Sequence, residues 1–344
     1  MNINNIINLV LSISIIIINT FVFILFLMRP QLTKKPSNRL LHSLSVCDWM
    51  SGTTVIIHVM IERSIFPHQS FAIRIGAEIY TTFIVGASVL HLLCITIDRA
   101  LSLFYALRYK DIVTLKSIKR VVIGIWVIPG LTSSLQITYL HPYVGGSDNI
   151  SLDEVEKIRT IEMWYSIICF VAYLMIPFIV MGILFFMMFR EVRKIILRTP
   201  SYTGQFSLNV TRQQRRAVYI FAVMYFCFAT LTLPHFTFRI YLDIQSHISQ
   251  DQITINLTIL NLFYIMKTLT SLCNPVMYTV LNREFRSVIQ VWIREKKKSF
   301  NRKFLSPQSS SSMGFMTRES LIYKKDGILV RIKDSDGSSN ETEV

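Results

Sequence analysis

Ionisable side chains inside long apolar runs are the first candidates for chemistry in this sequence. Asp48, Glu78 and Lys267 each lie in such a run, and a charge in an apolar setting is costly unless it is paired or functional. A carboxylate there can hold a cation or a shared proton, and an ammonium can pair with an acid, bind an anion or form a Schiff base. These residue types indicate ion or ligand binding. The sequence shows no metal cluster, phosphate loop or nucleophile with a base, so no enzyme is predicted.

The composition identifies the setting of these side chains. The 344 residues are 51% hydrophobic and 17% charged, whereas soluble domains carry about 25% charged residues. The net charge of +15 is spread over short segments between apolar runs, which argues against a nucleic-acid partner and for orientation in a membrane. The five cysteines all lie in apolar runs, so no extracellular disulfide framework is expected.

Seven apolar runs are long enough to be membrane spans, since a helix crosses a bilayer with about 20 apolar residues. They lie at roughly 6–28, 38–61, 72–104, 118–140, 163–189, 215–242 and 253–280. The first run lacks a basic leader and is too long for a cleaved signal peptide, so we expect it to remain as the first span.

The loops between the runs predict the orientation. Lysine and arginine are frequent in the loops after the first, third and fifth runs, whereas the segment 141–162 is acidic. The positive-inside rule therefore predicts an extracellular N-terminus and a cytoplasmic C-terminus. Asn149-Ile-Ser151 fits the N-glycosylation sequon on the outer side. Because such sequons arise often by chance, its use stays open.

The end of the seventh run carries the most specific motif. Asn274 and Pro275 interrupt the run, Tyr278 follows one turn later, and Phe285-Arg286 begins an amphipathic stretch. Taken alone, this is a membrane helix with a proline kink and a basic flank. The spacing resembles the end of the seventh helix and the start of the interfacial eighth helix in rhodopsin-like G-protein-coupled receptors.

The third run ends in Asp98-Arg99, which is similar to the Asp-Arg-Tyr motif of the same family, with Ala100 in the third place. The resemblance covers about residues 19–286. It implies an all-α, seven-transmembrane helix bundle in the plasma membrane, with an interfacial eighth helix and a heterotrimeric G protein as partner. An ordinary interfacial ion pair is the alternative for Asp98 and Arg99. The resemblance assigns activation roles to Asp98, Arg99, Phe228, Pro234, Asn274, Pro275 and Tyr278.

The same resemblance implies a polar pocket around Asp48 that can hold sodium and water. Its members would be Asn19, Asp48, Ser88 and Asn274. The alternative is a protonated aspartate that serves helix packing alone.

Besides Ala100, four positions depart from the family pattern. Thr232 replaces the usual sixth-helix tryptophan, Phe185 a fifth-helix tyrosine, Arg74 a disulfide cysteine, and Gln214 the acid that locks Arg99. The family's activation scheme therefore cannot be transferred whole.

The expected ligand residues are polar side chains in the outer half of the bundle. Thr81 occupies the position where amine receptors keep an aspartate, so a biogenic amine is disfavoured. Lys267 is one residue out of register with the retinal-binding lysine of opsins, which turns it about 100° away. Both signs of charge favour a peptide or an acidic small molecule, and a self-paired polar network stays open. The residues expected to contact the ligand are Glu78, Thr81, His235, Arg239, Tyr264 and Lys267.

The expected domains are a short extracellular N-terminus (1–5), the receptor domain (6–281), an amphipathic cytoplasmic helix with a basic stretch lying on membrane lipid (282–298), and a disordered tail (299–344). Thr342 and Val344 fit a PDZ ligand, and serines in the tail could recruit an arrestin-like partner after phosphorylation. Two alternative functions stay open: a non-signalling scaffold receptor anchored through a PDZ domain, and a transporter or channel. The sequence lacks the internal repeat typical of many transporters.

Overall fold

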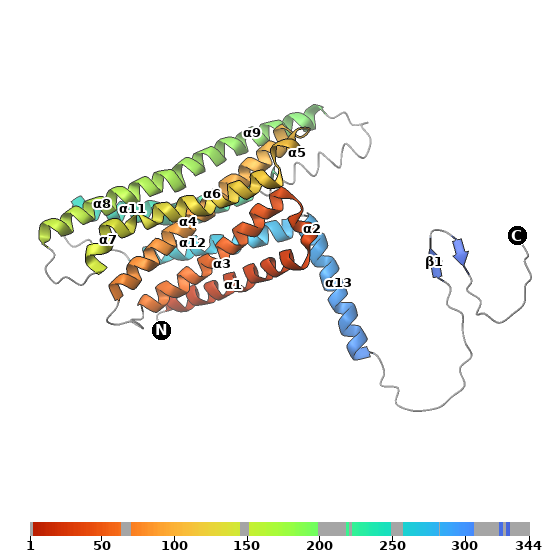
Figure 1. Ribbon diagram of the computed structural model, residues 1–344, viewed down its shortest axis with the longest axis horizontal. Helices are drawn as coiled ribbons and strands as arrows, with labels where there is room; N and C mark the ends of the chain where they lie inside the picture. Colours follow the sequence, from red (N-terminus) through yellow and green to blue (C-terminus); the bar gives the residue numbers. More distant parts are fainter. Residues whose placement is uncertain are drawn as a thin grey trace, which may run out of the picture. The chain divides into compact units, whose positions relative to one another are not determined.

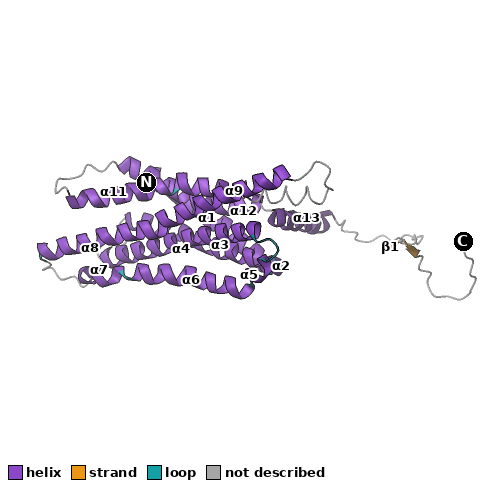
Figure 2. Ribbon diagram, turned by 90° about the horizontal axis from the view of Figure 1, so that it is seen from above, coloured by secondary structure: helices purple, strands orange, loops and turns teal. Residues whose placement is uncertain are grey.

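The structure is a computed structural model that describes residues 3–62, 70–144, 151–198, 218–219, 222–248, 257–281, 283–305, 323–325 and 328–330. The chain divides into two compact units, Met1–Ile289 and Gln290–Val344. In the first unit, long helices run side by side (Figures 1 and 2). They are α1 (Ile3–Met28), α2 (Pro30–Thr33), α3 (Pro36–Glu62), α4 (Ser70–Phe104), α5 (Tyr109–Ile112), α6 (Leu115–Ser134), α7 (Gln136–Val144), α8 (Leu152–Phe170), the π-helical turn η1 (Val171–Met175), α9 (Ile176–Arg198), a helical segment at 222–231, α11 (Leu233–Ile248) and α12 (Leu257–Leu281).

Among the described residues, five continuous helical segments are long and apolar enough to cross a membrane. These are Ile3–Met28, Pro36–Ile61, Ala72–Phe104, Leu115–Leu140 and Asp153–Ile195. The sixth predicted run is divided between residues 222–231 and α11, and the seventh is α12. The all-helical architecture of the described residues of the first unit agrees with the sequence prediction.

The fifth predicted span is longer than the apolar run suggested. Its helix begins with α8, where Ser151 and Glu154 form a capping box: each side chain accepts a hydrogen bond from the backbone N–H of the other. Such a cap satisfies donors at a helix start. Because this start lies in polar sequence, the helix projects beyond the apolar run at 163–189.

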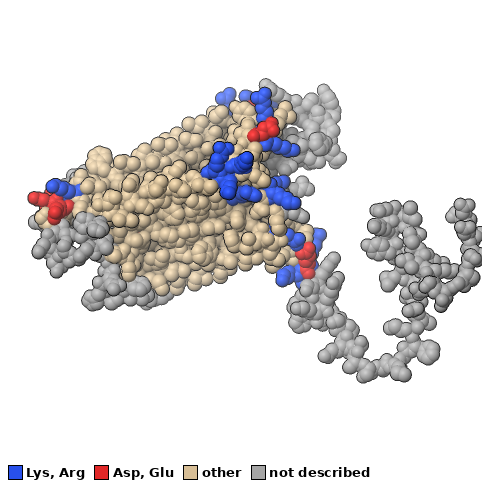
Figure 3. Space-filling model, in the orientation of Figure 1, with Lys and Arg blue, Asp and Glu red and all other residues tan. Residues whose placement is uncertain are grey.

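Two ends of the bundle can be distinguished by their charge. We call the end where α4 and α9 finish and α6 begins the inner end, after its predicted orientation, and the opposite end the outer end. On the face shown in Figure 3, lysine and arginine gather at the inner end, and uncharged surface covers most of the bundle between the two ends. Large apolar side chains of the bundle such as Ile17, Leu131 and Phe186 are exposed, as expected for a lipid-facing surface.

The centre of the bundle is formed by α3 and α4, which contact each other. In addition, α3 contacts α1, α6 and α12, and α4 contacts α6 and α9. His91, fully buried on α4, links three helices: its Nδ1 donates to the Ala87 carbonyl oxygen at 2.7 Å, since a carbonyl can only accept. Its Nε2 then accepts from the Ser43 hydroxyl at 2.8 Å, and the Ser43 oxygen accepts from the Trp126 indole N–H at 2.9 Å. A neutral imidazole therefore satisfies the whole network.

Two prolines lie next to interruptions of regular helix, and a third lies inside a continuous helix. The π-helical turn η1 ends just before Pro177, and Pro275 lies inside α12. Thr232 separates the helical segment 222–231 from α11, and Pro234 follows it. Proline cannot donate a backbone hydrogen bond, so each helix is weakened one turn before it.

Helix α13 (Arg283–Leu305) is amphipathic and follows α12. Val288 and Ile289 pack on the hydrophobic core of the first unit. In the second unit, the Lys296 ammonium lies 5.9 Å from the centre of the Trp292 ring. Two short strands, β1 (Tyr323–Lys325) and β2 (Ile328–Val330), pair antiparallel, with Tyr323 opposite Val330. The sequence prediction described residues 299–344, which include these strands, as a disordered tail.

The contact between α1 and α3 is close because Gly52 has no side chain. A Cβ atom at this position would lie 2.8 Å from Ile16 Cγ1 and 3.2 Å from the Ser12 carbonyl oxygen. We expect Gly52→Leu to destabilise the protein by about 1–3 kcal/mol, the usual cost of overpacking. Thermal unfolding in detergent measures this effect. Gly124→Leu is the matched control, since nothing lies within 4 Å of its Cβ position, and equal losses in both variants would contradict the prediction.

Candidate functional site

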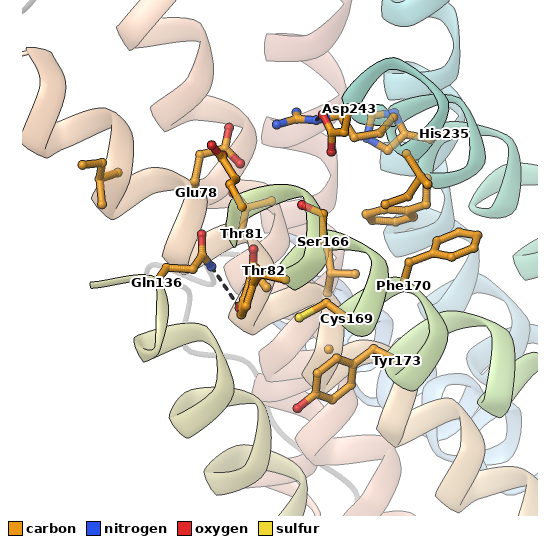
Figure 4. Close-up of a pocket in the computed structure, with 18 of the residues that line it drawn as sticks. Glu78, Thr81, Thr82, Gln136, Ser166, Cys169, Phe170, Tyr173, His235 and Asp243 are labelled. Carbon is orange, nitrogen blue, oxygen red and sulfur yellow. Dashed lines mark hydrogen bonds and ion pairs between the residues drawn. The ribbon is translucent and has the colours of Figure 1, made fainter. Parts of the chain in front are cut away.

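A cavity of about 680 Å³ lies among α4, α7, α8, α11 and α12 in the outer half of the bundle (Figure 4). This volume is within the range of about 300–1,000 Å³ that is usual for small-molecule sites. The structure places all six expected ligand residues in its wall: Glu78, Thr81, His235, Arg239, Tyr264 and Lys267. That they bind a ligand stays a prediction.

The α4 side of the cavity carries a carboxylate and a hydroxyl one turn apart. The Thr81 hydroxyl donates to the Ala77 carbonyl oxygen at 2.7 Å, so it accepts from His58 Nε2 at 3.0 Å. Glu78 is half-buried, and within the described ranges it makes no ion pair shorter than 4 Å. Glu78 and Lys267 therefore form no direct ion pair in the described part of the chain.

The α11 and α12 side carries two positive charges, Arg239 and Lys267. Arg239 Nε lies 3.4 Å from Asp243 Oδ1, one turn along the same helix. Lys267 Nζ lies 5.5 Å and 5.3 Å from the ring centres of Phe236 and Tyr264. Among residues that the structure describes, no carboxylate lies within ion-pair distance of this ammonium.

Several wall residues were not expected from the sequence. They are Arg74, Gln136, Arg159, Glu162, Ser166, Tyr173 and Asp243, among others. Asp243 could have been found from its i,i+4 spacing to Arg239. Glu162 was counted as part of an acidic loop, and the early start of α8 brings it into the helix. Gln136 donates to the Tyr165 hydroxyl at 3.2 Å, which ties α7 to α8 (Figure 4).

The polar pocket around Asp48 lies deeper in the bundle. Asn274 Nδ2 donates to both carboxylate oxygens of Asp48, at 3.2 Å each. Asn19 donates to the Ile15 carbonyl oxygen at 2.9 Å, and its own Oδ1 is buried without a partner in the described chain. Ser88 is half-buried on α4, and no hydrogen bond joins it to this group among the described residues. The carboxylate and the unpartnered amide oxygen are hard oxygen ligands that suit a sodium ion, and this binding stays a prediction.

Arg99 is held at the inner end by a network that includes Tyr109, a residue the sequence did not indicate. Arg99 donates twice to Asp98 Oδ2, from Nε at 3.0 Å and from a terminal nitrogen. The Tyr109 hydroxyl donates to Asp98 Oδ1 at 2.6 Å and accepts from the Ser37 hydroxyl at 2.8 Å. Burial, with the hydrogen bond to Asp98, raises the pKa of Tyr109 to about 12, so the phenol stays protonated at physiological pH.

The sixth and seventh helices meet through a hydroxyl pair. Thr232 and Thr270 are both buried, with their Oγ1 atoms 2.9 Å apart. Phe228, one turn before Thr232, is also buried, and Pro234 opens α11. The Tyr278 side chain lies outside the described residues, as do Asn149, Thr342 and Val344.

The comparisons with known proteins give one family. The model of the 7 transmembrane receptor family (rhodopsin family) matches residues 18–278. The chain is similar to the histamine H2 receptor of Cavia porcellus, with 26% identity over 73% of this chain and 68% of the relative. The same receptor of Canis lupus familiaris is 24% identical over 80% and 77% of the two chains. The octopamine receptor beta-1R of Drosophila melanogaster is 25% identical over 59% of this chain and 44% of the relative.

Proposed function

The chain belongs to the rhodopsin family of seven-transmembrane receptors, and on that premise we propose that it binds an extracellular ligand in the outer cavity and activates heterotrimeric G proteins. Membership confirms the predicted fold class and makes the chain a multi-pass membrane receptor rather than an enzyme. The ligand would act by shifting the population of bundle states toward one that exposes Arg99.

The observation that carries this proposal is that α4 joins both sites. Glu78 and Thr81 face the cavity near its start, and Asp98 and Arg99 lie near its end. At the inner end, Arg99 is held by Asp98, which also accepts from Tyr109. A ligand that favours a different position of α4 would therefore also change the hydrogen bonds of Asp98 that hold Arg99.

The cavity supports a peptide or an acidic small molecule over a biogenic amine. The relatives are named for histamine and octopamine, but they share only 24–26% of residues with this chain. Thr81 replaces the aspartate of amine receptors, and its hydroxyl is already engaged by Ala77 and His58. Both signs of charge line the cavity instead.

The remaining parts of the proposal concern orientation and partners. The basic inner end would face the cytoplasm, and the N-terminus would lie outside the plasma membrane. Thr342 and Val344 would bind a PDZ domain, and phosphorylated serines of the tail would bind an arrestin-like protein.

Nucleotide exchange on a panel of Gα proteins tests the function. In membranes, Arg99→Ala is expected to lose basal and ligand-stimulated exchange, because it removes the side chain proposed to meet the G protein. Lys194→Ala is the control, since it removes an exposed charge at the same end, whose partner is Glu191 at 3.3 Å. Exchange at background on every Gα, with the intact chain present at the cell surface, would favour the scaffold function instead.

A further inference from the structure

The cavity contains two opposite charges that do not neutralise each other directly. Glu78 on α4 and Lys267 on α12 both line it, and the structure records no ion pair between them within the described ranges. Buried opposite charges normally pair, because isolated charges lose hydration at a cost of several kcal/mol each, about what mutual contact could restore. Two separated charges in one cavity are therefore suited to a ligand that brings both counter-charges.

Lys267 is the stronger candidate for an anion. The other nearby cation, Arg239, has Asp243 at 3.4 Å, whereas Lys267 Nζ lies over the rings of Phe236 and Tyr264. A cation over an aromatic face gains about 0.5–2 kcal/mol, which is less than the cost of holding an ammonium near the middle of a membrane helix. A ligand carboxylate would supply the missing charge.

His235 provides a second donor beside Lys267. Its side chain is 8% exposed, and Nδ1 is buried with no hydrogen-bond partner in the described part of the chain. The imidazole ring lies edge-on to Phe236 and Tyr264, the same two rings that Lys267 covers. A buried unpartnered nitrogen carries a cost of about 1–3 kcal/mol, which a carboxylate accepting from it would remove.

Glu78 forms the opposite subsite. It lies one turn before Thr81 on the same face of α4 (Figure 4), so a cation held there does not need an aspartate at position 81. Aromatic side chains also line the cavity, among them Phe170 from α8 and Tyr173 from η1 (Figure 4). These rings suit an aromatic group on the ligand.

We propose that the cavity binds an aromatic zwitterion of amino-acid to dipeptide size, with its carboxylate on Lys267 and His235 and its protonated amine on Glu78. The inference rests on the proposed function, because it names the ligand class of the same cavity. Such a ligand would carry an amine, like the ligands for which the relatives are named, and also the acidic group proposed above for the ligand of this chain.

The test uses sets of three matched probes. Tyrosine, tyramine and 3-(4-hydroxyphenyl)propionate differ only in which charged group is present, and the same comparison is made for histidine, phenylalanine and aromatic dipeptides. Binding to the full-length protein in lipid nanodiscs is measured by calorimetry, without a G protein. We expect at least one zwitterion to bind at least tenfold more tightly than both of its singly charged analogues.

Two variants test which residue binds each charged group of the ligand. Lys267→Met should weaken the zwitterion and the amine-free acid at least tenfold and leave the amine unchanged, whereas Glu78→Gln should weaken the zwitterion and the amine and leave the acid unchanged. Retained binding of one analogue shows that each variant is folded, and Lys267→Arg should keep the preference of the parent. The controls Lys157→Met and Glu156→Gln change exposed charges on α8 that do not line the cavity.

Other outcomes would overturn the proposal. They are an amine that binds as tightly as its zwitterion with no effect of Lys267→Met, or a panel in which no zwitterion binds. Nucleotide exchange separates the two levels of inference. If a ligand activates exchange equally in the parent, Lys267→Met and Glu78→Gln, the zwitterion proposal is rejected and the receptor function is kept. If a zwitterion binds but no Gα shows exchange, the G-protein function is rejected and the zwitterion proposal is kept.

Discussion

Asp98→Asn is expected to raise basal nucleotide exchange by about 10- to 100-fold. In the parent, Arg99 donates two hydrogen bonds to Asp98, and Tyr109 donates a third to the same carboxylate. Hydrogen bonds to a charged group contribute about 1.5–3 kcal/mol, and losing that amount from the resting state shifts a two-state equilibrium by about 10- to 100-fold. Asparagine keeps the shape but lacks the negative charge, so Arg99 is released.

Two tyrosine variants test how much the Tyr109 hydroxyl contributes to the restraint on Arg99. Tyr109→Phe removes only the hydroxyl that joins Asp98 to Ser37, so a smaller rise is expected. Tyr105→Phe is the control, since Tyr105 is exposed in the same segment and should behave like the parent. Basal exchange unchanged in Asp98→Asn, at equal surface expression, would show that this network does not restrain Arg99.

His91→Leu is expected to destabilise the bundle by about 2–3 kcal/mol. The substitution keeps the side-chain volume but removes hydrogen bonds to Ser43 and Ala87, at about 1 kcal/mol each, and it leaves the buried Ser43 hydroxyl without its acceptor. The hydrogen-bonded link of α4 to α3 is then lost, whereas the hydrogen bond from Trp126 on α6 to Ser43 on α3 remains. Thermal unfolding in detergent should show a midpoint about 5 °C lower.

His42→Leu is the matched control for this experiment. His42 is packed between Phe23 and Phe26, with ring centres 5.2 Å and 4.8 Å away. Its Nε2 is buried with no hydrogen-bond partner among the described residues. Replacing an unsatisfied polar ring with an apolar side chain should be neutral or stabilising. Equal losses in the two histidine variants would mean that packing, and not the hydrogen-bond network, determines the cost.

The sequence predicted the helical spans well because each depends on a local property, the length of an apolar run. The irregular points were harder. The start of α8 depends on the cap formed by Ser151 and Glu154 in polar sequence, and the interruption at Thr232 depends on the proline two residues later as well as on packing against Thr270. Hydropathy alone carries neither signal.

The candidate site was predictable to the extent that polar residues in apolar runs are rare. That rule found Glu78 and Lys267, both of which line the cavity. It could not find Tyr109, which lies in a short helix between spans and reaches Asp98 only because α5 folds back on the end of α4. Nor could it show that Lys267 and Glu78 remain apart, since that depends on the rotation of α12 relative to α4.

The interruption at Thr232 has a mechanical consequence for signalling. The backbone N–H of Phe236 lies 3.5 Å from the Thr232 carbonyl oxygen, a long hydrogen bond, and Pro234 has no N–H to donate. The sixth helix therefore has two parts that meet at a weak point: α11, which places His235 and Arg239 in the cavity wall, and the segment 222–231, which extends about 15 Å toward the inner end at 1.5 Å per residue. A small tilt at this point would thus be magnified at the surface where a G protein would dock, while the position of α11 beside the cavity stays unchanged.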